Sequence, residues 1–430
     1  MQARYFEGLL GIVVWFLWTR VVGFLVAPAA AYFLVLGVAV LLSADAISER
    51  PLLSRLQVRP TTRWVVGVTS GVIVVLFGVA AVSAVLSPLP NIDPPVTLLC
   101  AAQNLRQGVV PYTTYEPQCY RQVGYKLLNA TPLEAGPFAN DAHYPSTSVQ
   151  LRVLRRDQQL GANAGFPAFG YPPDAALLLV PVAFTSWTFV SLWVAVVCGV
   201  LLVVMWRPAV PNKTLLVSWQ LAGLVFPVLG FGWNPELISY LLLALAFAIS
   251  TCPRRSAIAL AAAVCTNPLT WIAAPVYLAI MSRYPEFRRR LAWVSGGIAA
   301  GLLPWLLWDH RLVEQIWRFV VMPEFPVGVA IGIFAHLPAH SHLLYLVGFT
   351  AAVIGVALCA WRFERWRWSC AIVVYLALMV SWRALVYYYF AAFWLAPAVL
   401  AGWCRYHSAL GRLGMSLGGE RLGVDVDGYG

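Results

Sequence analysis

The chain has 430 residues, of which 60% are hydrophobic and only 11% are charged. Soluble domains carry about 25% charged residues, so this composition excludes an ordinary soluble domain and predicts an integral membrane protein. The net charge of +11 comes mainly from arginines between apolar runs, which is typical of cytoplasmic membrane loops rather than of a nucleic-acid-binding surface.

The first apolar run, residues 8–42, is almost unbroken. A single helix of that length would measure about 50 Å, whereas the hydrocarbon core of a bilayer is about 30 Å thick. We therefore expect Pro28 to divide the run into a hairpin, and 256–282 to form a pair of helices broken at Asn267–Pro268. The other expected spans are 64–87, 186–206, 214–230, 235–250, 291–308, 342–361, 369–383 and 385–404. The fold class predicted is an all-α polytopic membrane protein with about 10–13 transmembrane helices.

The basic residues predict the orientation of the chain. With these crossings, every segment that is rich in arginine or lysine falls on one side: 43–63, 207–213, 252–255, 283–290 and 362–367. Basic loops are cytoplasmic, so both termini are expected in the cytoplasm of a multi-pass plasma membrane protein. The long polar segment 88–172 is then extracytoplasmic, and its length and many tyrosines predict a small, partly helical folded element.

Four regions follow from this topology. Residues 1–63 are expected to form an N-terminal transmembrane hairpin and a cytoplasmic loop. Residues 64–206 are expected to form a module that contains the large extracytoplasmic loop, and 207–404 a C-terminal transmembrane bundle. The Gly-rich residues 405–430 are interpreted as a flexible cytoplasmic tail.

The eight cysteines have no metal-binding spacing. Cys100 and Cys119 share the long polar segment, where they could pair in an oxidising compartment or remain free thiols. The other six are interpreted as small buried hydrophobic residues: Cys198, Cys252, Cys265, Cys359, Cys370 and Cys404.

Asp93 is the first acid of the outer segment, in "SPLPNIDPPVTLLCAAQNLRQGVVPY". A helix is expected from Val96 to about Gln107, ending at Gly108. An acid before such a helix keeps its charge easily next to the positive end of the helix dipole. Asp93 can therefore act either as a simple N-cap or as a general base near neutral pH.

The stretch "YPPDAALLLVPVAF" marks the return of the chain to the membrane. Pro172 and Pro173 fix the backbone and start a helix. Tyr171 is expected to present its ring at the lipid headgroups, and Asp174 to cap or charge the first turn. Together they predict a stiff lip on which a lipid substrate rests.

These two motifs resemble glycosyltransferase family 87, the polyprenyl-phosphate-sugar-dependent enzymes of the membrane GT-C architecture. The order of Asp93, Ala101–Ala102, Leu105, Gly108 and Tyr112 matches the first motif of the family. Tyr171, Pro172, Pro173 and Pro181 match the second, and Asn234 matches an outer turn. The chain departs from the family at Asn267–Pro268, where a Lys-Pro is usual, and at Ser381–Trp382, which no histidine pair follows.

The resemblance implies an inverting transferase with Asp93 as the catalytic residue. It implies a polyprenyl-phosphate donor, with mannose as the first and arabinofuranose as the second choice of sugar, and a glycolipid or lipoglycan acceptor in the membrane. Residues proposed for the donor phosphate are Arg106, Arg152, Arg155, Arg156 and Arg383. Residues proposed for the substrate and lipid rim are Tyr112, Tyr171, Pro172, Pro173, Asp174, Asn234 and Tyr387.

No cofactor and no metal site are expected. His336, His340 and His342 lie on the outer side, but no fourth ligand accompanies them. The alternative function is a polytopic transporter of a lipid or solute, against which the near absence of acids inside the spans argues. A catalytically inactive scaffold of the same fold is a further alternative.

Overall fold

The computed structural model describes residues 2–21, 29–48, 63–87, 93–112, 117–123, 145–160, 169–206, 213–321, 327–328, 341–379, 383–384 and 395–405. Helices dominate these ranges, as expected for an all-α protein. Two-residue strands are also present, because β1 (Val327–Gly328) pairs in parallel with β2 (Arg383–Ala384).

The N-terminal hairpin is confirmed as two packed helices, α1 (Gln2–Val21) and α2 (Ala29–Ala46). Pro28, the expected breaking point, lies outside the described residues. Gly11 allows the two helices to approach closely, since a Cβ atom there would lie 2.6 Å from the carbonyl oxygen of Ala39.

The remaining upright helices follow the expected apolar runs closely. They are α4 (Arg63–Leu86), α9 (Trp187–Trp206), α10 (Lys213–Phe231), α11 (Glu236–Ala248), α12 (Pro253–Thr266), α13 (Ala274–Met281), α14 (Phe287–Trp308), α16 (Ser341–Trp366) and α17 (Ser369–Met379), with a further helix at 395–405. The break at Asn267–Pro268 is confirmed, because α12 ends at Thr266 and the short 3-10 helix η4 (Pro268–Ile272) follows. Of the expected span 369–383, α17 covers 369–379 and Arg383 begins β2, whereas 380–382 lie outside the described residues. Of the expected span 385–404, only 395–404 lies among the described residues.

The described residues contain fewer helices long and apolar enough to cross a membrane than the number of transmembrane helices expected. Within the described ranges, three helices are long and apolar enough to cross a membrane: Gly67–Leu86, Trp187–Trp206 and Phe287–Trp308. Of the 10–13 transmembrane helices expected, some of them short, these residues therefore support three by length and composition. The physical reason is that proline and asparagine interrupt the apolar runs, so that α11 and the pair at 253–281 form shorter helices.

Large apolar side chains point away from the protein on all three of these helices. Val75 is 64% exposed on α4, Val203 is 67% exposed on α9, and Leu307 is 80% exposed on α14. Exposed apolar surface that follows whole helices is typical of a membrane-facing or interaction surface. The composition and these helices together identify a membrane-associated protein.

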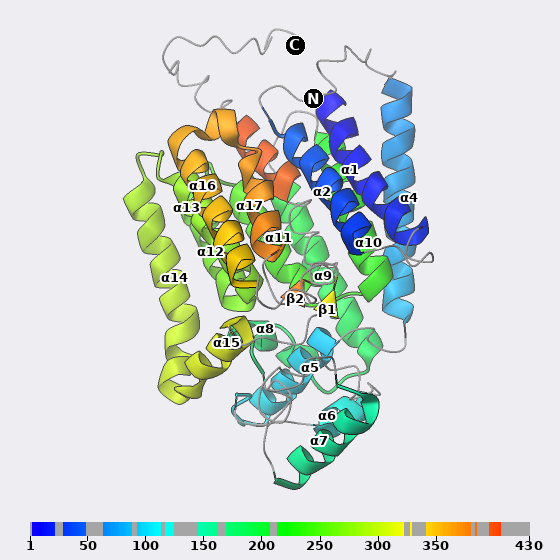
Figure 1. The fold of residues 1–430 in the computed structure, drawn as a ribbon, viewed down its shortest axis with the longest axis vertical. Coiled ribbons are helices and arrows are strands. Elements are labelled where there is room, and N and C mark those ends of the chain that lie inside the picture. The colour runs from blue at the N-terminus through cyan, green and yellow to red at the C-terminus, as the bar shows by residue number, and fades with distance from the viewer. Residues whose placement is uncertain are drawn as a thin grey trace.

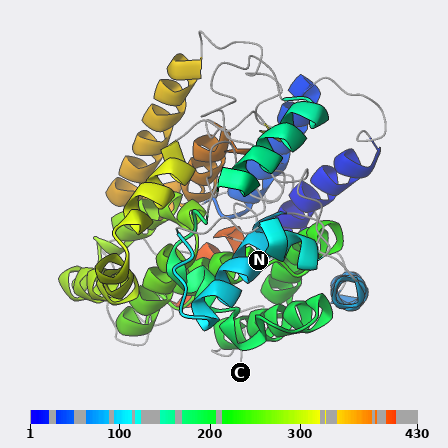
Figure 2. The same ribbon diagram turned by 90° about the horizontal axis from the view of Figure 1, so that it is seen from below.

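A second layer of short helices lies at one end of the bundle (Figure 1). It contains α5 (Asp93–Arg106), α6 (Pro117–Gln122), α7 (Thr147–Leu160), α8 (Pro173–Leu177), the 3-10 helix η3 (Val180–Val182) and α15 (Arg311–Val321). Seen from below, α5 and α7 lie lengthwise across the view, whereas α4 is seen nearly end-on (Figure 2). The expected partly helical element within 88–172 is thus confirmed. We call α5, α6, α7, α8, η3 and α15 the lower layer.

Helix α5 starts three residues earlier than expected. It begins at Asp93 rather than Val96, because Pro94 and Pro95 occupy its first turn, where a missing N–H costs nothing. The helix is followed by Gly108 at a φ of 74°, a left-handed conformation that glycine adopts without strain.

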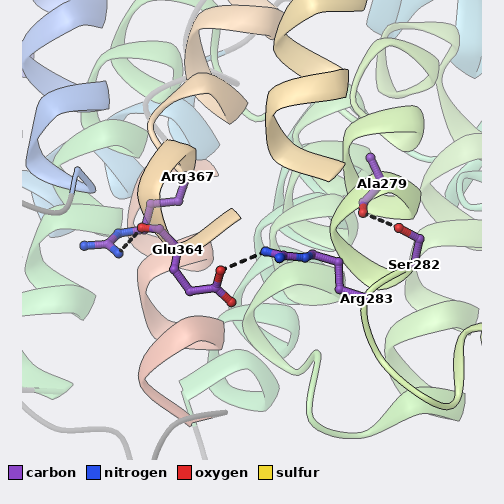
Figure 3. A network of polar contacts seen from close by, with 5 residues as sticks. All are labelled: Ala279, Ser282, Arg283, Glu364 and Arg367. Carbon is purple, nitrogen blue, oxygen red and sulfur yellow. Dashed lines mark hydrogen bonds and ion pairs between the residues drawn. The ribbon is translucent and has the colours of Figure 1, made fainter. Parts of the chain in front are cut away.

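In the described part of the chain, several arginines gather at the opposite end of the bundle. Arg283, between α13 and α14, forms an ion pair with Glu364 of α16 at 2.8 Å. Arg367 donates to the carbonyl oxygen of Glu364 at 2.8 Å (Figure 3). It also donates to the carbonyl oxygen of Ser48 at 2.6 Å. The turns that follow α2, α13 and α16 are therefore tied together; we call this the arginine-rich end.

Two further arginines, Arg4 and Arg405, contact the ends of α2, α9 and α11 at this end of the bundle. Arg4 donates to the carbonyl oxygen of Ala46 at 3.1 Å, and Arg405 donates to that of Met205 at 2.8 Å. Arg405 also donates to the carbonyl oxygen of Ala248, at the end of α11. Helix C-termini carry carbonyl groups without partners in the helix. These guanidinium groups therefore stabilise helix ends on the side of the bundle that the sequence predicts to be cytoplasmic.

The interpretation of the cysteines holds for most of the six. Cys198, Cys265, Cys359 and Cys370 are buried. Cys252 is an exception and is exposed, because it lies in the turn directly before α12, and Cys404 is only partly buried.

Candidate functional site

Four polar side chains connect the lower layer to the bundle. The Tyr112 hydroxyl donates to the carbonyl oxygen of Tyr171 at 3.0 Å, and the Tyr171 hydroxyl donates to Oε1 of Glu236 at 2.8 Å. Nδ2 of Asn234 donates to Oε2 of Glu236 at 2.9 Å, while the Glu236 N–H donates to Oδ1 of Asn234 at 3.1 Å. We call Tyr112, Tyr171, Asn234 and Glu236 the clamp.

The clamp corrects the expectation of a lipid-facing rim. Tyr171 is 3% exposed, Tyr112 is 1% exposed and Asn234 is 2% exposed. Their polar atoms find buried partners, so the rings pack inside the protein, with Tyr112 and Tyr171 both against Phe169. Tyr171 therefore holds the chain in place rather than presenting its ring to lipid headgroups.

Helix α8 starts directly after the clamp. Pro172 is its N-cap residue, with φ −57° and ψ 150°, and Pro173 is its first residue; both are buried. No side chain makes a capping hydrogen bond at this N-cap. The structure thus gives Asp174 no capping hydrogen bond, but it places the acid in the first turn of α8, where it was expected to charge that turn.

Asp174 lies where α8 packs against α12 and α14. A Cβ atom at Gly301 of α14 would lie 3.1 Å from Oδ2 of Asp174 and 2.7 Å from Sγ of Cys265. Burial raises the pKa of Asp174 from its ordinary value of 3.8 to about 6. Burial also raises the pKa of Tyr112, and the charges of Asp174 and Asp309 raise it further.

Asp174→Asn is expected to stabilise the protein at about pH 7, by about 1–2 kcal/mol after a discount for the partial exposure of the side chain. The folded-state pKa of Asp174 lies above its unfolded value, so ionisation opposes folding. This penalty is absent below about pH 4 and complete above about pH 7. Thermal unfolding of wild type and Asp174→Asn in nanodiscs, at about pH 4 and at about pH 7, measures the gain in stability. An equal gain at the two pH values would contradict the electrostatic explanation.

Asp93, the predicted catalytic residue, is the first residue of α5. Its side chain lies outside the part of the chain that the structure describes. The helix that it begins packs against α8 and η3, so the two acid-bearing helices of the lower layer are neighbours.

Cys100 of α5 and Cys119 of α6 form a disulfide. This observation decides between the two alternatives left open by the sequence. Both cysteines are buried together with Val96 and Tyr120, in a small core of the lower layer. The disulfide therefore fastens α6 to α5 in a part of the molecule too small to have a large core of its own.

Thiol counting tests this pairing. The chain has eight cysteines, of which six are free in the structure. After denaturation in detergent, a polymer-linked maleimide is expected to add six labels without reductant and eight with it. The double variant Cys100→Ser/Cys119→Ser is the control and should give the same count in both states; eight labels on the unreduced wild type would exclude the disulfide.

The predicted phosphate-binding arginines do not form one cluster in the described residues. Arg106 is exposed at the end of α5, where its guanidinium lies 5.2 Å from the ring centroid of Phe184. Arg152, Arg155 and Arg156 are exposed on α7, which Figure 1 places farthest from the bundle. Arg383 begins β2, and its side chain lies outside the described part, as does the whole of Tyr387.

Three residues of the site were missed by the sequence interpretation: Glu236, Gly301 and Asp309. Glu236 carried a usable signal, since an acid at the start of an apolar run is a functional candidate by default. Gly301 carried none, because its approach to Asp174 depends on how α8 packs against α14. Asp309 carried none either, because only the folded chain brings its charge near Tyr112.

No group of three or more His, Cys, Asp or Glu residues suited to a metal occurs among the described residues. Comparison with protein-family models, curated proteins and solved structures finds no match to this chain.

Proposed function

We propose that the chain is an integral-membrane inverting glycosyltransferase that uses a polyprenyl-phosphate sugar. The observation that carries the proposal is the position of two acids in the lower layer. Helix α5, which begins at Asp93, packs against α8, which carries Asp174, at the end of the bundle opposite the arginine-rich end. From this position an acid can contact the sugar and phosphate of a lipid-linked donor while the lipid chain stays in the bilayer.

The sidedness of the site is part of the proposal. Arginine-rich turns are retained in the cytoplasm, so the lower layer is extracytoplasmic and both termini are cytoplasmic. The disulfide of Cys100 and Cys119 supports this orientation, because such bonds persist in oxidising compartments. The protein is then a multi-pass protein of the plasma membrane.

Asp93 is the general base of the proposed reaction. It accepts the proton of the acceptor hydroxyl while the hydroxyl oxygen forms a bond to the anomeric carbon. The bond between that carbon and the phosphate oxygen breaks, and the lipid phosphate leaves with the electron pair, so the anomeric configuration inverts. Cationic groups stabilise the leaving phosphate; the candidates are Arg106, Arg152, Arg155, Arg156 and Arg383.

We also propose that the chain has the GT-C architecture of family 87. This proposal rests on the motif at Asp93 and on Tyr171, Pro172 and Pro173. In this architecture the shorter apolar helices would also be membrane segments. Mannose is the proposed sugar, arabinofuranose is the alternative, and the acceptor is a glycolipid or lipoglycan of the cell envelope.

Reconstitution in proteoliposomes tests the proposal. Purified protein in a bacterial lipid extract receives polyprenyl-phosphate carrying labelled mannose or, in a parallel sample, labelled arabinofuranose. Transfer of one label to a new glycolipid, absent from empty liposomes, is expected. Movement of the intact donor between leaflets without a new product would support a transporter instead, and an unchanged donor in both samples would contradict the proposal.

A further inference from the structure

We propose that the Asp174 carboxylate binds hydroxyl groups of a sugar, and that Glu236 and Gly301 act as positioning residues for it. This inference rests on the proposed function, because it names the part of the substrate that Asp174 contacts. It adds a second functional carboxylate to the site, beside the general base.

The first argument is that Asp174 lacks a partner. In the part of the chain that the structure describes, no hydrogen bond or ion pair reaches its carboxylate. A partly buried carboxylate without partners is costly. Hydroxyl groups that donate to it recover that free energy when a ligand binds, so the site is better suited to the bound state than to the empty one.

The second argument is that the backbone around Asp174 is held in place. Tyr171 is fixed through its hydroxyl by Glu236 and through its carbonyl oxygen by Tyr112. The two residues between Tyr171 and Asp174 are Pro172 and Pro173, whose rings restrict the backbone dihedral angles there. A side chain on a constrained backbone loses little conformational freedom when it binds a ligand, which is how binding residues are usually supported.

The third argument is the space left by Gly301. Any larger residue at this position would press on Oδ2 of Asp174 and on Sγ of Cys265. The glycine therefore allows the carboxylate to lie against α14.

The surrounding charges select the chemical class of ligand. In the described residues, the ionisable groups that interact electrostatically with Asp174 are Tyr112 and Cys265, and Asp309 interacts in turn with Tyr112. None of these is a cation, so a phosphate would be repelled. Sugar hydroxyls are neutral donors and suit such a site, whether they belong to the donor or to the acceptor.

Direct binding measurements test the inference without relying on turnover. Wild type and Asp174→Asn, in nanodiscs, are titrated with short-chain prenyl-phospho-mannose, with the same prenyl phosphate lacking the sugar, and with octyl mannoside as a surrogate acceptor. The variant is expected to bind a sugar-bearing ligand about tenfold to a hundredfold more weakly, with unchanged affinity for the prenyl phosphate. Weakening with the first ligand assigns Asp174 to the donor sugar, and weakening with octyl mannoside assigns it to the acceptor.

The dependence on pH separates ligand contact from a structural role. Asp174 becomes protonated as the pH falls through its pKa of about 6, so the wild type should lose its advantage over Asp174→Asn below that value. Equal affinities of the two proteins for both sugar ligands would overturn the inference. The inference would also be overturned if Asp174→Asn bound the prenyl phosphate and the sugar ligands with equally reduced affinity. Asp174 would then maintain the structure of the site without contacting the sugar.

Two glycines of α14 provide a matched pair. Gly301→Ala crowds Asp174, whereas Gly297→Ala places a Cβ atom 2.7 Å from that of Ala261 and does not reach Asp174. Only Gly301→Ala is expected to weaken sugar binding; the same loss in both variants would contradict its positioning role. If the wild type binds sugar through Asp174 but transfers none, the proposed function fails and this inference stands.

Discussion

Asp93→Asn is expected to reduce sugar transfer by about 10²- to 10⁴-fold, the range typical of a lost general base. An amide cannot accept the proton of the acceptor hydroxyl, whereas its size and its place at the start of α5 are unchanged. The loss should therefore appear in kcat, with little change in the KM of donor or acceptor. Initial rates of label transfer in proteoliposomes, at several concentrations of each substrate, measure both constants.

Glu286→Gln is the matched control for this variant. Glu286 is also an acid at the start of a helix, α14, but it lies at the arginine-rich end, with its side chain 53% exposed and 3.6 Å from Arg290. Its replacement removes the same charge far from the lower layer and should leave transfer within about twofold of wild type, because the Glu286 carboxylate is itself 53% exposed and only the buried Arg290 loses an ion pair. If Asp93→Asn retained wild-type kcat, Asp93 would be an N-cap residue only, and the proposed mechanism would lose its base.

Much of the helical framework could be predicted from the sequence, because apolar runs and their interruptions are local signals. The break after Thr266 follows from Asn267–Pro268, and the end of α5 follows from Gly108. The number of long spans could not be predicted in the same way. An apolar run shows that a segment is buried in protein or lipid, but not which of the two surrounds it.

The candidate site was less predictable, because its parts come from distant segments. Tyr171 and Glu236 are 65 residues apart, and only the packing of the lower layer on the bundle brings them together. Tyr171 could be identified as special from its place before Pro172, yet its buried hydrogen bond reverses the role that the sequence suggested. Local motifs can thus mark a residue without showing which way its side chain points.

Glu236→Ala is expected to destabilise the protein by about 2–5 kcal/mol, because it leaves two buried donors without their acceptor. Glu236 is 2% exposed, and both of its carboxylate oxygens accept hydrogen bonds, from Tyr171 and from Asn234. Thermal unfolding in nanodiscs at about pH 7 should show a clear fall in the midpoint, whereas Asp174→Asn should raise it. The opposite signs follow from chemistry: one carboxylate has its partners inside the protein and the other does not.

Glu236→Gln separates the contribution of the clamp from the loss of volume. The glutamine carbonyl can still accept from the Tyr171 hydroxyl, but its amide group would meet Nδ2 of Asn234, a donor opposite a donor. An intermediate loss of stability is therefore expected, with sugar binding closer to wild type than in Glu236→Ala, because Tyr171 still holds the chain before Asp174. If Glu236→Ala unfolded at the wild-type midpoint, the clamp would contribute nothing to stability. The support that it gives to Asp174 would then have to come from Pro172 and Pro173 alone.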